Sequence, residues 1–521
     1  MLARAILYVL IFLIELAIFA KFRSVKVRQA CLLAGSCALY LSWGIWFGAV
    51  LLTSIVMNYV LGRWIRRIPI ASVLWIGLLL NLALLSTYKY LPEIAITLPL
   101  SSMQRFAHLA LPLGISFWTF QAMSYLFDLY RGEELDPSFV EFALYMAFFP
   151  VTISGPICRM PDMLPQFRSD KALEWGEIER GFGRIATGVL MMQLARLLGQ
   201  GILAGDGIDS GFDRIAHWSG PDVWCLAVGF GLQLFFDFAG YSHIAIGAAK
   251  VLGFTVPENF ARPFQSTTIS VFWTRWHTSL SFWIRDYVFL PLAVLRREMW
   301  WRNLVLVLSM VLFGLWHNAS LLFIIWGCYH GVLLVLHRQA QQLQRRFDWQ
   351  PPAQLWTPLS WITTFTLVSL GWIFFRAHSL PKASQMLSAV LSPASYRSHM
   401  VSGSLYLLVA LLGCGYAIVL LGIEALDSYS VETGVAQEHA GAGIISLLAR
   451  KALVLDSASL RCDLAAGVSR DAEPRPGDVP VHVSRFLDWL VWLSYTKRVH
   501  HSEQCAVRSK HRKSVPRAGQ A

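Results

Sequence analysis

The sequence is poor in charged residues. Asp, Glu, Lys and Arg make up 15% of the 521 residues, whereas soluble proteins carry about 25%. Hydrophobic residues make up 55% of the chain, and the mean hydropathy is +0.50. This balance excludes an ordinary soluble protein and indicates a chain that lies largely within a lipid bilayer.

Two kinds of reactive-site motif are also missing. The eight cysteines include no C-x-x-C pair or other metal-ligand spacing, and most of them lie in apolar runs. No G-x-S-x-G elbow is present to hold a nucleophilic serine. We therefore expect no disulfide, no metal site, no bound cofactor and no serine nucleophile.

Apolar stretches recur from the first residues to about Ile423. They predict an all-α, polytopic membrane protein with about ten to twelve transmembrane helices of about 20 residues each, some tilted or re-entrant. The candidate spans are 6–20, 29–44, 46–61, 70–88, 107–127, 139–157, 184–204, 222–248, 303–336 (one span or two), 358–375 and 403–423.

The charges near the start of the chain predict its orientation. The first stretch follows only Arg4 and lacks a small-residue cleavage site, so we interpret it as a retained helix. Basic clusters at 21–28 and 63–67 belong on the cytoplasmic side by the positive-inside rule, which places the N-terminus outside.

Half of the net charge of +12 comes from the end of the chain. The last 26 residues hold seven Lys or Arg and only Glu503 as an acid, which favours anionic membrane lipid over nucleic acid as the partner. We divide the chain into N-terminal helices (1–106), a catalytic core (107–380), a C-terminal helix (381–423) and a peripheral or disordered tail (424–521).

His317 is the most informative residue of the core. It lies with Asn318 and His330 in the apolar run Leu304–Leu336. An ionisable side chain within a membrane segment is a functional-site hypothesis by default. The alternative is a histidine that donates a hydrogen bond between packed helices.

A second polar segment spans residues 268–291. Arg275, His277, Arg285 and Asp286 alternate there with Trp, Phe and Tyr, and a charge at the bilayer centre costs about 3 kcal/mol unless it is paired or hydrated. The segment is either an interfacial amphipathic helix or a re-entrant element that lines a pore. If helical, it places His277, Ser281 and Arg285 on one face.

Two further segments interrupt apolar runs with polar or turn residues. Residues 148–156 contain two prolines and a glycine, and residues 235–243 contain Asp237, Tyr241 and His243. Either these are kinked helices packed by small residues, or they line a cavity, where non-helical backbone is tolerated at membrane depth. A neutral histidine in such a cavity can accept a proton from a hydroxyl, which suits acyl transfer from a thioester to an alcohol.

Several ordered motifs between about Pro112 and Arg376 resemble the bacterial membrane-bound O-acyltransferase family, in particular its branch for alginate O-acetylation and teichoic acid D-alanylation. The motifs are Pro112–Gln121, Tyr125–Arg131, Phe148–Pro156, Phe236–Ser242, Pro257–Phe260, Phe272–Tyr287, Gly314–Ser320, Trp326–Gly331 and Trp372–Ala377.

The resemblance implies a ring of tilted helices around a central tunnel, with His317 as the catalytic residue and His277 near the cytoplasmic mouth. We expect Arg275, Arg285, Asp286, Asp237, Tyr241, Asn318 and His330, the polar residues set in apolar sequence, to line the substrate site or the tunnel. The chain departs from the family pattern at His243, where aspartate is usual, and at Asn318, where glycine is common.

The resemblance also implies a reaction. A cytoplasmic donor, acetyl-CoA or another acyl thioester, supplies acetyl groups for O-acetylation of an exported polysaccharide such as alginate. The implied location is the bacterial inner membrane, and the implied partners are a periplasmic SGNH-type acetyltransferase and the polysaccharide export machinery. Two alternatives stay open: D-alanyl transfer to teichoic acid, and a non-enzymatic acyl transporter or scaffold.

Overall fold

The protein is helical throughout the part that the computed structural model describes, which comprises residues 2–97, 106–203, 205–214, 217–349 and 351–432. These residues form no β-strand, only an isolated bridge between Phe260 and Trp276. The α-helices are α1 (Leu2–Lys21), α2 (Val25–Leu41), α3 (Ile45–Arg67), α4 (Ala71–Lys89), α5 (Leu91–Thr97), α6 (Ile115–Tyr130), α7 (Phe139–Ala147), α8 (Met160–Phe167), α9 (Trp175–Gln200), α10 (Ile208–Arg214), α11 (Gly220–Val251), α12 (Ile269–Arg275), α13 (Thr278–Ile284), α14 (Leu290–Ala293), α15 (Met299–His317), α16 (Leu321–Arg346), α17 (Ala353–Arg376), α18 (Leu380–Leu391) and α19 (Gly403–Glu432). Short 3₁₀ turns occur at η2 (Pro263–Gln265) and η4 (Pro393–Arg397), and η3 (Arg285–Phe289) is a π-helical turn.

Seven described helices are long and apolar enough to cross a membrane. They are α3, α4, α11, α15, α16, α17 and residues 403–423 of α19. The predicted all-α, polytopic membrane class is therefore confirmed. Helices α2 and α6 cover two further predicted spans, but with 17 and 16 residues they are short for a crossing.

The predicted span at 139–157 is wrong. Helix α7 has only nine residues, because Ser138 starts it with a capping box to Glu141 and a buried turn follows it from Phe148. Gly114 has a φ of +69°, and a Cβ at this position would lie 2.0 Å from the carbonyl oxygen of Thr152. The turn is thus packed inside the protein, where non-helical backbone is tolerated at membrane depth.

Glu141 also anchors the segment that follows the turn. The Arg168 guanidinium donates to both oxygens of its carboxylate, at 2.7 and 2.9 Å. This pair holds the pKa of Glu141 at about 2, below its ordinary value, because the hydrogen bonds from Arg168 favour the charged form.

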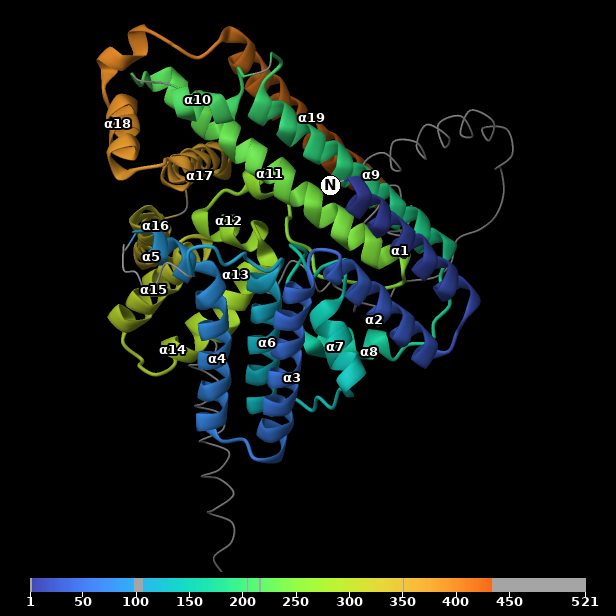
Figure 1. Cartoon of the computed structure of the whole chain (residues 1–521). Coiled ribbons are helices and arrows are strands. Elements are labelled where there is room, and N and C mark those ends of the chain that lie inside the picture. The colour runs from blue at the N-terminus through green and yellow to red at the C-terminus, as the bar shows by residue number, and fades with distance from the viewer. Residues whose placement is uncertain (1, 98–105, 204, 215–216, 350, 433–521) are drawn as a thin grey trace, which may run out of the picture. The chain divides into compact units, whose positions relative to one another are not determined.

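The segment 235–243, in contrast, does not interrupt a helix. It lies within α11, which runs unbroken for 32 residues along α9 (Figure 1). Gly240 faces Gly188 of α9, and a Cβ on either glycine would lie within 3 Å of the other's carbonyl oxygen. The small residues in this motif therefore allow two long helices to pack closely, and they do not break the span.

The long apolar run 303–336, for which one span or two stayed open, forms two helices, α15 and α16, packed as a hairpin (Figure 1). Gly314 and Gly327 lie where the two helices approach most closely. A Cβ on Gly314 would lie 2.2 Å from the carbonyl oxygen of Phe323, and one on Gly327 would lie 2.4 Å from that of Met310.

The predicted domain boundaries stay interpretations. Helices α3 and α4 pack against α6, across the predicted division at residue 106. The last predicted span is confirmed as part of α19. The tail that we expected from residue 424 lies, beyond Glu432, outside the described residues.

Candidate functional site

His277 lies at a break between two short helices. Helix α12 ends at Arg275, and His277 caps the N-terminus of α13 with a φ of +45°. The segment 268–291 is therefore not one continuous helix, and the break comes before His277, whose carbonyl accepts from the backbone N–H of Ser281. His277 has a left-handed conformation, which is uncommon for a residue with a side chain and often found at functional sites.

The His277 ring takes part in a buried polar network centred on Asn259. His277 Nδ1 lies 3.3 Å from Asn259 Oδ1, which also accepts hydrogen bonds from the hydroxyl and the backbone N–H of Ser279. The Asn259 amide nitrogen donates to Ser242 on α11 at 3.1 Å. Asn259 is fully buried and His277 is 2% exposed, so this network is closed to bulk water.

His317 is the last residue of α15 and is half-buried. Its ring stacks on Phe313, with centroids 5.6 Å apart, and meets the Trp316 ring edge-on at 4.6 Å. Both rings also contact His277, at 6.3 and 6.1 Å between centroids. The structure thus places the two histidines against the same aromatic pair, although 40 residues separate them in the sequence.

The last residue of α4 and its C-cap residue hold the end of α15. The Lys89 ammonium donates to the carbonyl of Trp316 and lies 4.7 Å from the centroid of its ring. The Tyr90 hydroxyl donates to the carbonyl of Leu315 at 3.0 Å. The last carbonyls of a helix have no partner within it, and a cation at that end is favourable. Lys89 and Tyr90 therefore fix the turn that carries His317.

His330 lies one helix turn beyond Trp326, on the face of α16 that packs inward, and is 1% exposed. Its ring is edge-on to those of Trp273 and Trp326, at 5.1 and 4.9 Å. Neither ring nitrogen has a hydrogen-bond partner within the described part of the chain. The Trp326 ring centroid also lies 5.8 Å from that of His317, so the Trp326 indole contacts both His317 and His330.

The charged residues predicted near His277 occupy different surroundings. Arg285 and Asp286 form an ion pair at 2.6 Å, and Asp286 also binds Arg159 at 2.7 Å. Arg275 is half-buried at the end of α12, where its carbonyl accepts from the backbone N–H of Ala261.

The remaining predicted lining residues lie on α11 and after α15. Asp237 is exposed, whereas the neighbouring Phe238 contacts the His277 ring at 4.6 Å. Tyr241 is half-buried one turn further along. Asn318 follows His317, and its Oδ1 is buried without a partner among the described residues. Tunnel-lining roles for these residues stay predictions.

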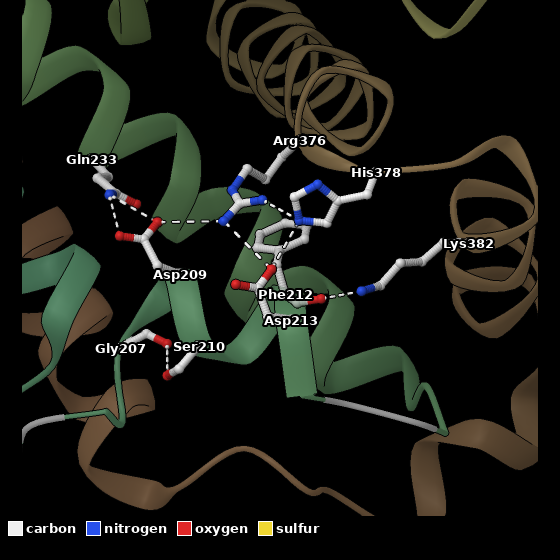
Figure 2. A network of polar contacts seen from close by, with 9 residues as sticks. All are labelled: Gly207, Asp209, Ser210, Phe212, Asp213, Gln233, Arg376, His378 and Lys382. Carbon is white, nitrogen blue, oxygen red and sulfur yellow. Dashed lines mark hydrogen bonds and ion pairs between the residues drawn. The ribbon is translucent and has the colours of Figure 1, made fainter. Parts of the chain in front are cut away.

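A second polar network lies where α10 meets α17 and α18 (Figure 2). Arg376, at the end of α17, approaches Asp209 and Asp213 at 3.6 and 3.8 Å. His378 Nε2 binds Asp213 at 2.8 Å, and this hydrogen bond lowers the pKa of the Asp213 carboxyl. These carboxylates and the imidazole are more than half exposed. Lys382 of α18 donates to the carbonyl of Phe212, so the exposed network joins α10 to α17 and α18.

Sequence reasoning missed Asn259 and Lys89 as candidate site residues. Asn259 lies in the motif Pro257–Phe260, but nothing in its spacing indicates that it binds a histidine 18 residues further on. Lys89 is the cation that ends an apolar helix, a position that equally suits membrane anchoring. Within the described ranges, no group of three or more His, Cys, Asp or Glu side chains could hold a metal ion.

Comparison with known proteins identifies the family. Residues 60–376 match the model of the membrane-bound O-acyltransferase family, so the match begins well before the Pro112 motif. The chain is similar to the probable alginate O-acetylase AlgI of Pseudomonas putida, with 33% identity over 384 residues that cover 70% of this chain and 75% of that protein. It is 32% identical to the peptidoglycan O-acetyltransferase of Helicobacter pylori over 69% of this chain and 73% of the relative. The teichoic acid D-alanyltransferase of Bacillus subtilis is 32% identical over 50% of this chain and 68% of its own length. The chain therefore belongs to the membrane-bound O-acyltransferase family, as a multi-pass membrane enzyme that transfers acyl groups to hydroxyls.

Proposed function

We propose that this enzyme transfers acetyl groups for the O-acetylation of an exported polysaccharide, with His317 and His277 as its catalytic pair. The observation that carries the proposal is their shared aromatic contact. Phe313 and Trp316 both lie against the two imidazoles. A histidine at the end of one helix and a histidine at a break in another are thereby brought to one place.

The chemistry follows from this arrangement. An acceptor hydroxyl attacks the carbonyl carbon of the acyl thioester, and a neutral imidazole takes the hydroxyl proton as the new C–O bond forms. The C–S bond then breaks, and the leaving thiolate recovers a proton from the imidazolium. His317 is the proposed base for the hydroxyl, and His277 assists on the donor side. The apolar rings around them exclude water that would hydrolyse the thioester.

The names of the relatives support the choice of acyl group and acceptor. Alginate and peptidoglycan are polysaccharides outside the cytoplasm, and both named relatives are O-acetyl-transferring proteins over about 70% of this chain. We infer that the donor is acetyl-CoA or another acetyl thioester on the cytoplasmic side. The proposed location is the bacterial inner membrane, with a periplasmic SGNH-type acetyltransferase and the export machinery as partners.

Substitution of His317 tests the proposal. In cells that lack their own copy of the gene, His317→Ala at unchanged membrane level should lower the O-acetyl content of the exported polysaccharide by roughly 100-fold or more. His337→Ala is the matched control, since His337 is a half-buried histidine of the neighbouring helix α16. Unchanged O-acetyl content in His317→Ala would overturn the assignment.

D-alanyl transfer to teichoic acid is the second candidate. It is favoured by the similarity to a teichoic acid D-alanyltransferase, which covers half of this chain. Membranes that contain the protein can be given radiolabelled acetyl or D-alanyl thioester in parallel. Acetyl label in the polymer supports the first proposal, and D-alanyl label alone supports the second.

A further inference from the structure

We infer that Asn259 is a positioning residue that keeps the proton of His277 on Nδ1 and leaves Nε2 as a bare proton acceptor within the site. The inference rests on the proposed role of His277, and it assigns that role to one nitrogen. Asn259 acts through His277 and has no proposed contact with the acyl group.

The orientation of the Asn259 amide follows from its backbone partner. The backbone N–H of Ser279 can only donate, and it points to one terminal atom of Asn259 at 3.4 Å. That atom must therefore be the oxygen. The other end then carries the NH₂ group, which donates to the hydroxyl of Ser242.

The tautomer of His277 follows from the same atom. An amide oxygen only accepts, so the His277 nitrogen 3.3 Å away must carry the proton. In the neutral imidazole, Nε2 is then unprotonated. This Nε2 atom is buried and has no hydrogen-bond partner among the described residues, so its lone pair is available to a substrate proton.

Backbone pairing holds the position of His277 independently of the Asn259 side chain. The N–H of Ala261 donates to the carbonyl of Arg275, and the N–H of Thr278 donates to the carbonyl of Asn259. These two bonds flank His277 and fix its left-handed backbone. Loss of the Asn259 side chain also removes its bonds to Ser279 and Ser242, so the tautomer of His277 is the readout that separates positioning from a general loss of structure.

A neutral amide at position 259 suits the apolar surroundings of His277. The rings against His277 are those of Phe238, Phe313 and Trp316, none of which carries a charge. A carboxylate at position 259 would place a charge in this apolar interior at high cost. An amide fixes the tautomer without that cost.

The decisive measurement is nitrogen NMR of the full-length protein in lipid nanodiscs with ¹⁵N-labelled histidine rings. The signals of His277 are assigned by their loss in His277→Gln. We expect a protonated Nδ1 and a bare Nε2 in the unsubstituted protein, and a mixture of both tautomers in Asn259→Leu. Asn259→Asp should keep Nδ1 protonated, because a carboxylate also accepts from it.

Activity gives the second readout. At equal membrane level, Asn259→Leu should lower polysaccharide O-acetyl content roughly tenfold or more, and Asn259→Asp should lower it less. Asn81→Leu is the matched control, because Asn81 is also a fully buried amide, and its bonds go to Asn58 and to Gly77 of its own helix. It should leave O-acetyl content unchanged.

The outcomes separate this inference from the proposed function. A protonated Nε2 in the unsubstituted protein, or one unchanged tautomer in Asn259→Leu, overturns the role of Asn259 whatever the activity. If Asn259→Leu does not accumulate, the tautomer of the unsubstituted protein still decides the question. The expected tautomers with no loss of O-acetylation in His277→Gln would confirm the positioning and refute the function of His277.

Discussion

The two polar networks of this protein satisfy their polar groups in opposite ways. Around Arg376, the guanidinium meets carboxylates of α10, and the imidazole of His378 binds Asp213 (Figure 2). Around His277 and His317, in contrast, several buried polar atoms lack a hydrogen-bond partner among the described residues. They include His277 Nε2, Asn318 Oδ1 and both nitrogens of His330.

This difference agrees with the catalytic role proposed for the buried histidines. An unpaired buried polar group costs about 1–3 kcal/mol of folding free energy. A site persists at that cost when the group must stay available to another molecule. The exposed network carries more formal charge, and its carboxylates, guanidinium and imidazole bind one another, whereas Gln233 Oε1 is its one buried atom without a partner among the described residues. We therefore expect large effects on acyl transfer in the buried region and small effects on stability in the exposed one.

The largest effects should come from the two histidines of the proposed catalytic pair, His317 and His277. His277→Ala should lower polysaccharide O-acetyl content by roughly 100-fold to 10,000-fold, the range for loss of a general acid or base. The double variant His277→Ala/His317→Ala should be little worse than either single variant, because the two residues act as one unit. A multiplicative loss in the double variant would show independent roles.

Lys89 should have an intermediate effect. Lys89→Met removes the cation that caps the end of α15 and should lower the rate of acetyl transfer roughly threefold to tenfold, for about 1 kcal/mol of lost interaction. Lys89→Arg, which keeps the charge and the donor, should restore most of the rate. Equal losses in both variants would show that the charge is irrelevant.

Glu141 should affect stability and leave the chemistry intact. Its folded-state pKa of about 2 lies below the unfolded value near 4.3. The stabilisation is therefore fully present above about pH 4.3 and is lost as the pH falls through the folded pKa. Glu141→Gln should lower the melting temperature in detergent by roughly 2–4 °C at pH 7.

The same measurement at low pH checks the cause. The difference in melting temperature between Glu141→Gln and the unsubstituted protein should shrink towards pH 3. A difference independent of pH would mean that the Glu141 charge is not responsible.

The smallest effect should come from the exposed network. His378→Gln removes the partner of Asp213, but both groups are more than half exposed, and such surface pairs contribute little. We expect a shift in melting temperature of no more than about 2 °C and unchanged O-acetyl content. A loss of O-acetylation at normal stability would place this network in the reaction path and end the contrast between the two regions.

Much of the fold could be predicted from hydropathy, because apolar runs of bilayer length have few structural alternatives. Sequence reasoning was least reliable at proline and small residues, because these residues either mark a turn or allow two helices to pack closely. The prolines and glycine near Thr152 mark a real turn, whereas Gly240 marks a close crossing within an unbroken helix. Composition alone does not separate these cases, since the difference depends on whether another backbone lies alongside.

The site was predictable at the level of motifs, and less so at the level of partners. His317 and His277 could be selected because ionisable groups are conspicuous in apolar sequence. Asn259 and Lys89 could not, since their roles depend on contacts with residues 18 and 227 positions away. The break at His277 was equally hidden, because its positive φ is imposed by backbone pairing with residues 259–261.

The hydrogen bonds from Lys89 and Tyr90 to the end of α15 limit how far the enzyme can be truncated from its N-terminus. Lys89 and Tyr90 belong to the N-terminal part of the chain, outside the span in which the recognisable motifs begin at Pro112. A fragment trimmed to those motifs would lose both donors to the end of α15 and leave the carbonyls of Leu315 and Trp316 open. The N-terminal helices thus contribute to the proposed reaction centre, and we expect a minimal functional unit to begin upstream of α4.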